Sequence, residues 1–184
     1  MADSFDYVII GAGSAGCILA NRLTADGKHT VCLLEAGPPD WNPYIHIPAG
    51  FIKTLTNPNI NWLYQSEPSH WTGGRSIDVP RGKTLGGSSS INGHIYNRGQ
   101  RMDFDSWSQR GNRNWGYSDV LPYFQRCEQR IGDADDLYRG REGNLKVTDL
   151  NYSHPLCEKF IEGAQQIGLP RNPDYNGKQQ EGIS

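Results

Sequence analysis

The feature that most constrains this chain is a short glycine loop, residues 11–16, that separates two different patterns of apolar residues. Before the loop, residues 5–10 are rich in β-branched and aromatic side chains, which is typical of a buried parallel strand. After it, residues 14–25 place apolar side chains at helical spacing, and residues 30–34 form a second strand-like run. The sequence therefore predicts a βαβ unit of an α/β fold.

The loop itself reads G-x-G-x-x-G, and each of its glycines has a physical reason. Gly11 permits the tight turn, Gly13 lets the backbone approach a diphosphate, and Gly16 allows the helix to pack closely on the strand. The amino terminus of the helix offers unpaired N–H groups and the positive end of its dipole to phosphates. Glu35, at the end of the second strand, is suitably spaced to accept hydrogen bonds from a ribose. We therefore predict a Rossmann-like dinucleotide-binding unit, for FAD or NAD.

Glycine is enriched in this chain, with 22 of 184 residues, and it is clustered rather than spread. The largest cluster lies in residues 82–94, where paired glycines precede three serines. An exposed Gly/Ser linker is the alternative interpretation. The cluster is short, however, contains Leu85 and Ile91, and leads into the apolar-aromatic pair Ile95-Tyr96. We therefore expect a backbone segment, with hydroxyl donors, that comes close to a ligand.

These two glycine segments resemble the glucose–methanol–choline (GMC) oxidoreductases. Residues 82–92, GKTLGGSSSIN, followed by Tyr96, Gly99 and Asp105, look like the first signature of that family. The opening FDYVIIGAGSAGCILANRL and the turn at 35–37 also resemble it. The similarity extends along nearly the whole chain and is greatest to the bacterial choline-dehydrogenase-like branch.

The resemblance implies FAD as the cofactor and oxidation of an alcohol by hydride transfer to the flavin. It implies that the adenine-dinucleotide part of FAD is bound by Gly11, Gly13, Ser14, Ala15, Gly16, Glu35 and Ala36. It carries flavin and diphosphate contacts onto Gly86, Ser88, Asn92, Gly93, His94 and Ile95, several of them through backbone groups. We expect His94 to act through its backbone rather than as an acid or base. Arg81 and Lys83 could neutralise the diphosphate or lie at the surface.

Ile91 stands where family members with covalently attached FAD have a histidine, so the resemblance implies a non-covalent flavin. Family members also continue well beyond residue 184, and their catalytic His–His or His–Asn pair lies in that later part. We therefore expect no catalytic residue within this chain and no activity from it alone. The alternatives are an inactive flavin-binding remnant, or a family member with lyase or decarboxylase chemistry.

The expected organisation has two parts. Residues 1–110 form the first part of the FAD-binding domain, with a covering loop at about 38–60 and a hairpin at about 62–80. Residues 111–184 begin an α+β substrate domain, and the carboxyl-terminal remainder is absent. Helices are expected at 103–109, at 118–130 with Ser118 as its cap and Pro122 in its first turn, and at 156–167. The last should turn Phe160, Ile161 and Ala164 towards one side, and residues 143–147 should form a strand.

Composition limits the other classes of function. The net charge of −2 gives no electrostatic case for nucleic acid or an anionic membrane. No apolar run approaches the ~20 residues of a membrane span, and no signal-type stretch opens the chain. The four cysteines lack CxxC spacing, which favours reduced thiols and a cytoplasmic location. No histidine has a partner at ligand spacing, so no metal is expected. The expected partners are a small alcohol and an electron acceptor, either oxygen or another carrier.

Overall fold

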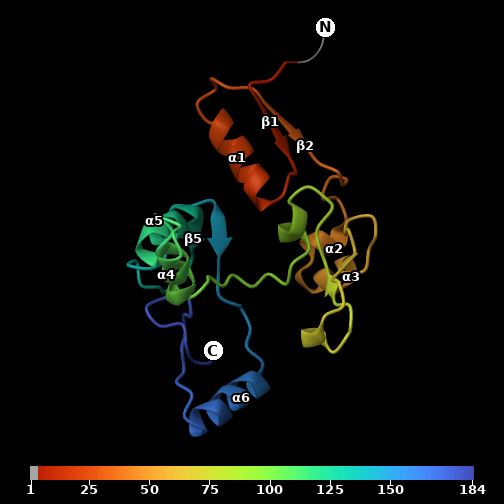
Figure 1. Cartoon of the computed structure of the whole chain (residues 1–184). Coiled ribbons are helices and arrows are strands. Elements are labelled where there is room, and N and C mark those ends of the chain that lie inside the picture. Colours follow the sequence, from red (N-terminus) through yellow and green to blue (C-terminus); the bar gives the residue numbers. More distant parts are fainter. Residues whose placement is uncertain (1–3) are drawn as a thin grey trace. The chain divides into compact units, whose positions relative to one another are not determined.

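The computed structural model describes residues 4–184, which divide into two compact units, Met1–Ile95 and Tyr96–Ser184 (Figure 1). The first three residues, on which the expected lack of a signal-type stretch partly rests, lie outside the described residues. The division by contacts comes earlier in the chain than residue 110. The functional domains at 1–110 and 111–184 stay a prediction. Within residues 4–184, no helix is long and apolar enough to cross a membrane.

The first unit opens with the predicted βαβ unit. Strand β1 (Tyr7–Ile10) and strand β2 (Val31–Leu34) pair in parallel, with Tyr7 opposite Val31, and α1 (Ser14–Thr24) connects them. Figure 1 shows α1 lying along the two strands. Gly16 is buried in α1, and a Cβ there would lie 1.9 Å from the carbonyl oxygen of Gly11. Only glycine fits at this position, as the loop pattern predicts.

The segment predicted as a covering loop contains short helical turns. These are α2 (Pro43–His46), a 3₁₀ turn at Pro48–Gly50 and α3 (Phe51–Thr54). The buried apolar cluster of the unit consists of Ile45, Ile60 and Ile91. It joins the covering segment to the second glycine loop, whose residues Gly87–Ser90 form a 3₁₀ turn.

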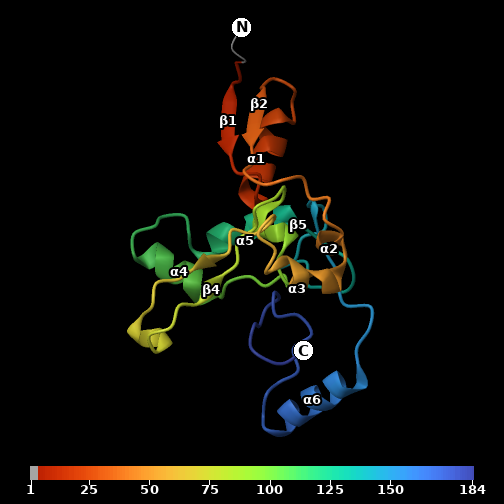
Figure 2. The ribbon, with the colours of Figure 1, turned by 90° about the vertical axis from the view of Figure 1, so that its right-hand side faces the viewer.

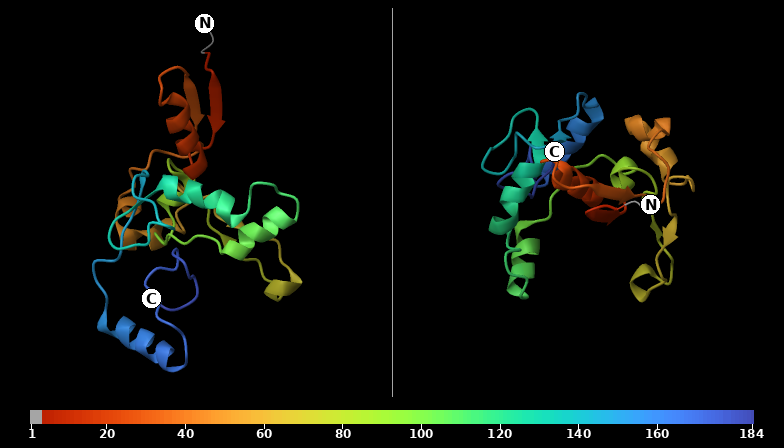
Figure 3. Two further views of the ribbon diagram at one scale, coloured as in Figure 1. Left: turned by 90° about the vertical axis from the view of Figure 1, so that its left-hand side faces the viewer. Right: turned by 90° about the horizontal axis from the view of Figure 1, so that it is seen from above.

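The predicted hairpin is present but shorter than residues 62–80. Strand β3 (Tyr64–Gln65) pairs antiparallel with β4 (Asp78–Val79). Its tip, drawn in yellow in Figures 2 and 3, contains a 3₁₀ turn at His70–Thr72. Side-chain hydrogen bonds between Ser69 and Thr72 build this tip.

The second unit contains α4 (Arg101–Gln109), α5 (Tyr117–Cys127), β5 (Glu128–Arg130), β6 (Leu145–Val147) and α6 (Pro155–Gln166). Strands β5 and β6 pair in parallel. The helices expected at 103–109 and 156–167 and the strand expected near 143–147 are therefore found, with slightly different bounds.

The helix expected at 118–130 is corrected at both ends. The prediction that Ser118 caps it is wrong, because the helix begins at Tyr117 and Gly116 is the cap residue. The N–H of Gly116 donates to the carboxylate of Asp119 at 3.0 Å, and the N–H of Tyr117 donates to the carboxylate of Asp105 at 2.9 Å. Pro122 lies beyond the first turn, inside the helix. Residues 128–130 leave the helix and form β5.

The apolar face of α6 is also narrower than expected. Ile161 and Ala164 are buried, but Phe160 is 73% exposed. Adjacent residues on an α-helix are about 100° apart around its axis. Phe160 therefore lies at the edge of the apolar face formed by Ile161 and Ala164, and its side chain is not buried with theirs.

A buried ion cluster explains why β5 replaces the last turn of α5. Glu128 is fully buried and pairs with Arg98 at 2.6 Å and with Arg139, which also pairs with Asp174. Burial is the largest single influence on the pKa of Glu128 and raises it. The hydrogen bonds from Arg139 and the Gly140 N–H, with the charges of both arginines, outweigh burial and hold the pKa below its usual value.

The cluster predicts a marked effect of Glu128→Gln on stability. Because the substitution removes the anion that pairs with buried Arg98 and one of the two that pair with buried Arg139, we expect a loss of about 3 kcal/mol in the free energy of unfolding. A carboxylate with a depressed pKa stabilises the fold above its ordinary pKa, and that contribution is lost as the pH falls. Urea unfolding at pH 7 and about pH 4 should therefore show a smaller decline with acid in the variant than in the wild type.

Glu162→Gln is the matched control, because Glu162 forms a solvent-exposed pair with Lys159. Exposed pairs contribute little. Equal losses in the two variants would contradict a stabilising role for the buried cluster.

Candidate cofactor site

The two glycine loops predicted from the sequence lie against each other in the first unit. The N–H of Gly86 donates to the carbonyl of Ala12 at 2.7 Å, and Gly13 and Gly86 form a parallel bridge. A Cβ on Gly87 would lie 2.8 Å from the Cα of Gly13. Two segments far apart in the sequence thus form one backbone surface, which larger residues at Gly87 would push apart.

The first loop presents an open face next to the start of α1. Gly11 has φ +96°, which L side chains rarely adopt, and a Cβ at Gly11 or Gly13 would meet nothing within 4 Å. In the described chain, α1 begins without a side-chain cap and without an acidic residue in its first turn. Its free N–H groups and positive dipole end are therefore available to an anion.

Glu35 follows β2 and joins that strand to the loop. Its carboxylate accepts from the N–H of Ala12 at 2.7 Å and from the N–H of Gly37 at 3.0 Å. An ionised carboxylate can accept about four hydrogen bonds, so these two leave capacity for hydroxyl donors. Glu35 and the neighbouring Ala36 lie beside the first glycine loop, where the ribose contact was predicted.

The turn after Glu35 is fastened to the second loop. The hydroxyl of Thr84, which is fully buried, donates to the carbonyl of Pro38 at 2.8 Å, and the Leu85 N–H donates to the same carbonyl at 3.1 Å. A Cβ on Gly37 would lie 1.9 Å from the carbonyl oxygen of Lys83. In the sequence, Gly37 and Thr84 were noted only as parts of family motifs. In the structure they hold the turn after Glu35 against the second glycine loop.

The three serines of the second loop are used differently from expectation. Ser89 and Ser90 donate to the carbonyls of Gly86 and Leu85, so these hydroxyls build the loop rather than face a ligand. The Ser88 hydroxyl accepts from the Gly82 N–H at 3.1 Å and keeps its own hydrogen. Of the three, Ser88 is the one left with a free donor for a cofactor.

Residues 92–95 leave the loop as an exposed turn. The Asn92 side chain accepts from the His94 N–H at 3.0 Å, and His94 has the unusual φ of 59°. The rings of His94 and Phe51 meet edge to face at 6.3 Å, so α3 of the covering segment contacts this turn. A Cβ on Gly93 would lie 3.9 Å from the Phe51 ring, and Ile95 is 77% exposed.

The two basic residues beside the loop are engaged with their neighbours. The Lys83 ammonium lies 4.7 Å from the centre of the Trp62 ring, and Arg81 donates to the carbonyl of Pro80. Neutralisation of the diphosphate by these two side chains stays a prediction.

Comparison with known proteins places this arrangement in a family. The GMC oxidoreductase family model matches residues 5–184. The chain is 48% identical over 178 residues to the oxygen-dependent choline dehydrogenase of Brucella ovis, and 44% identical over 179 residues to an alcohol dehydrogenase [acceptor] of Pseudomonas putida. Each match covers 97% of this chain and 32% of the relative.

A solved structure agrees in fold. The pyridoxine 4-oxidase of Mesorbium loti superposes with a TM-score of 0.88 at 35% identity, over 97% of this chain and 35% of that one. The chain thus spans about a third of the length of the proteins it matches. The family resemblance read from the two glycine segments is confirmed: this chain belongs to the GMC oxidoreductases and corresponds to their amino-terminal part.

Proposed function

We propose that this chain forms the FAD-binding part of an enzyme that oxidises an alcohol by hydride transfer to flavin. The observation that carries the proposal is the contact between the two glycine loops beside the uncapped start of α1. Family membership and relatives named as choline and alcohol dehydrogenases support the reaction class. Because the chain covers about a third of these relatives, the activity concerns the whole enzyme.

The residues present fit a dinucleotide. The open space beside Gly11 and Gly13 accepts a diphosphate close to the backbone, where the N–H groups of α1 would balance its charge. The remaining acceptor capacity of Glu35 suits the hydroxyls of a ribose, and its charge disfavours a ribose phosphate. The proposed contacts to the adenine-dinucleotide part are Gly11, Gly13, Ser14, Ala15, Gly16, Glu35 and Ala36.

The second loop and its exposed turn would hold the flavin end. Ser88 has a free hydroxyl hydrogen, and the turn after Ile91 exposes backbone groups. Bound FAD would supply the hydride acceptor, while residues of this chain would bind and orient it. The proposed contacts are Gly86, Ser88, Asn92, Gly93, His94 and Ile95, and we assign no catalytic residue to the described chain.

We further propose that the flavin is held without a covalent bond. Ile91 carries no nucleophilic atom, and its side chain is only 2% exposed because it packs with Ile45 and Ile60. The side chain at this position therefore belongs to the apolar cluster.

Gly13→Ala tests the diphosphate site with little risk to the fold. The position has no neighbour within 4 Å of a new Cβ and does not have a positive φ, so the substitution is sterically tolerated. A methyl group would, however, occupy the space proposed for the diphosphate. We expect FAD affinity, measured by titrating flavin fluorescence, to fall by about tenfold or more.

Gly163→Ala in α6 is the matched control, since a Cβ there also meets nothing within 4 Å. It should leave FAD affinity unchanged. An unchanged affinity of the Gly13→Ala variant for FAD would contradict the proposed diphosphate site. Tighter binding of NAD than of FAD by the wild-type protein would contradict the choice of cofactor.

Acid precipitation of the flavin-loaded protein tests the mode of attachment. Because Ile91 cannot form a bond to the flavin, the yellow colour should remain in the supernatant. Colour that stays in the protein pellet would contradict non-covalent binding.

Bleaching of the flavin band at about 450 nm tests the reaction class. In the complete enzyme, anaerobic addition of choline or a simple primary alcohol should bleach this band, because hydride from the carbinol carbon reduces the flavin. A flavin band that no alcohol bleaches would contradict alcohol oxidation and favour a flavin-binding protein of another function.

A further inference from the structure

The proposed flavin-contacting turn, residues 92–95, opens with an Asn-Gly pair. Asn92 and Gly93 are exposed and belong to no helix or strand. Because glycine has no Cβ, its backbone nitrogen is less hindered than that of any other residue. This nitrogen can approach the Cγ carbon of the preceding asparagine and close a small ring. The pair thus holds a nucleophile next to an electrophilic carbon.

The groups that would react at Asn92 are accessible. Its Oδ1 accepts from the N–H of His94 at 3.0 Å, which stabilises the negative charge that develops on this oxygen when Cγ is attacked. Within the described residues, neither the Asn92 NH2 group nor the Gly93 N–H donates a hydrogen bond to a protein atom. The leaving amine and the attacking nitrogen therefore have no competing protein partner.

The sequence contains a second Asn-Gly pair, Asn176-Gly177, which is held in the opposite way. Asn176 is only 5% exposed. Its NH2 group donates to the carbonyl of Tyr96 at 2.8 Å, and its Oδ1 accepts from the N–H of Arg98 at 2.8 Å. The Gly177 N–H donates to the carbonyl of Asp174 at 3.1 Å. Both the leaving amine and the attacking nitrogen are therefore engaged at this pair.

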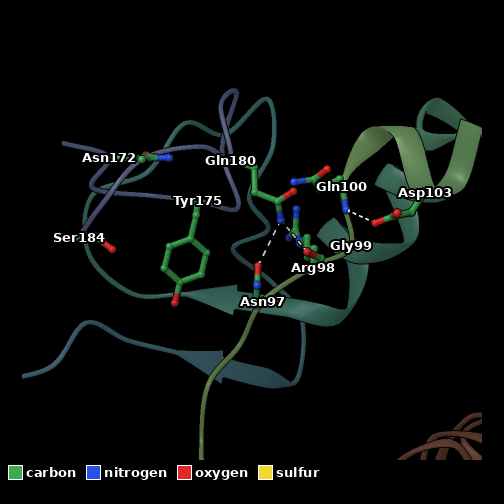
Figure 4. Close-up of a pocket in the computed structure, with 10 residues that line it drawn as sticks. Asn97, Arg98, Gly99, Gln100, Asp103, Asn172, Tyr175, Gln180 and Ser184 are labelled. Atoms are coloured by element: carbon green, nitrogen blue, oxygen red, sulfur yellow. Dashed lines mark hydrogen bonds between the residues drawn. The ribbon is translucent and has the colours of Figure 1, made fainter. Parts of the chain in front are cut away.

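The loop that carries Asn176 is also fixed at its neighbouring residues. Gln180 donates to the carbonyl of Arg98 at 2.7 Å and to the side chain of Asn97 at 3.3 Å, as Figure 4 shows. Asp174 pairs with the buried Arg139. Ring closure requires the asparagine side chain and the following peptide group to rotate towards each other, which a fixed loop resists. The chain therefore contains its own protected reference for Asn92.

We propose that Asn92 is a site of spontaneous deamidation and that bound FAD shields it. The Gly93 nitrogen gives up its proton and bonds to Cγ of Asn92, the Cγ–Nδ2 bond breaks, and the amine takes up a proton and leaves as ammonia. Water then opens the cyclic imide at either carbonyl and gives aspartate or isoaspartate. The shielding rests on the proposed FAD-binding function, because it requires the flavin to lie against residues 92–95.

Deamidation would change the proposed flavin end of the site. It replaces an amide, which donates and accepts hydrogen bonds, by a carboxylate, which only accepts them and carries a negative charge. That charge is unfavourable in a site for an anionic cofactor. Chains that lack FAD should therefore lose the ability to bind it with time, whereas loaded chains should keep Asn92 intact.

Incubation of the wild-type chain at mildly alkaline pH tests the site, because base removes the proton of the Gly93 nitrogen. Tryptic peptides 84–98 and 172–178 carry the two pairs, and fragment spectra locate the deamidated residue. In the folded chain we expect Asn92 to react at least about tenfold faster than Asn176. In urea the two rates should become similar, because the protection of Asn176 depends on the fold.

Gly93→Ala tests the ring closure. The new Cβ would meet only the Phe51 ring, at 3.9 Å, and the backbone at Gly93 does not have a positive φ, so the substitution is sterically tolerated. We expect deamidation of Asn92 to slow by about tenfold, because the Cβ hinders the attacking nitrogen. The rate at Asn176, measured in the same sample, should not change.

Asn92→Asp reproduces one product and tests its effect on the cofactor. The aspartate can still accept from the His94 N–H, but it lacks the amine donor and adds a charge. We expect FAD affinity to fall by about tenfold. Asn151→Asp, which adds the same charge at an exposed asparagine of the second unit, should leave the affinity unchanged.

Repeating the incubation with saturating FAD tests the shielding and separates the two proposals. Bound FAD should slow deamidation of Asn92 by about tenfold and leave Asn176 unaffected. Equal rates at the two asparagines in the folded, FAD-free chain overturn the deamidation site. An unchanged rate at Asn92 in a chain that binds FAD overturns the shielding. A wild-type chain that does not bind FAD overturns the proposed function, whereas the comparison of Asn92 with Asn176 still stands.

Discussion

The contact of the second glycine loop with Ala12 is the interaction on which the first unit depends. The peptide group on each side of Ala12 is occupied: its N–H donates to Glu35, and its carbonyl accepts from the Gly86 N–H and from the Cys17 thiol. Ala12 is fully buried. One residue of the first loop therefore joins the end of β2, the start of α1 and the second loop. These bonds of Ala12 hold the first glycine loop in place from its buried side. The space beside Gly11 and Gly13 on the other side of the loop therefore stays open.

The two units achieve their cohesion by different physical means. In the first unit the backbone approaches so closely at Gly16, Gly37 and Gly82 that a Cβ at any of them would lie about 2 Å from a carbonyl oxygen. Its buried apolar cluster has only three isoleucines. In the second unit, ion pairs around Glu128 bring together residues from 98 to 174. Substitutions with larger side chains should therefore damage the first unit most, and loss of charge the second.

The sequence predicts the first forty residues well because their signals are local. Strand runs, helical spacing and the glycine loop predict β1, α1 and β2 with bounds that differ by no more than two residues from those found. The end of α5 could not be predicted, because Glu128 leaves the helix for two arginines that are distant in sequence. The roles of Ser89 and Ser90 were likewise hidden, since a serine pattern does not say whether a hydroxyl faces a ligand or its own loop. The meeting of the two glycine loops was not predicted, because no local pattern contains it.

Ile91 links the packing of the first unit to the proposed way of holding flavin. Its side chain fills the cluster with Ile45 and Ile60, and its backbone begins the turn that continues to Tyr96. A histidine at this position would either bury a polar ring among isoleucines, which costs free energy without a hydrogen-bond partner, or turn outwards and leave the cluster unfilled. Isoleucine at position 91 therefore anchors the start of the 92–95 turn in the apolar cluster. If the flavin is held as proposed, without a covalent bond, its affinity would depend on the anchoring of this turn at Ile91.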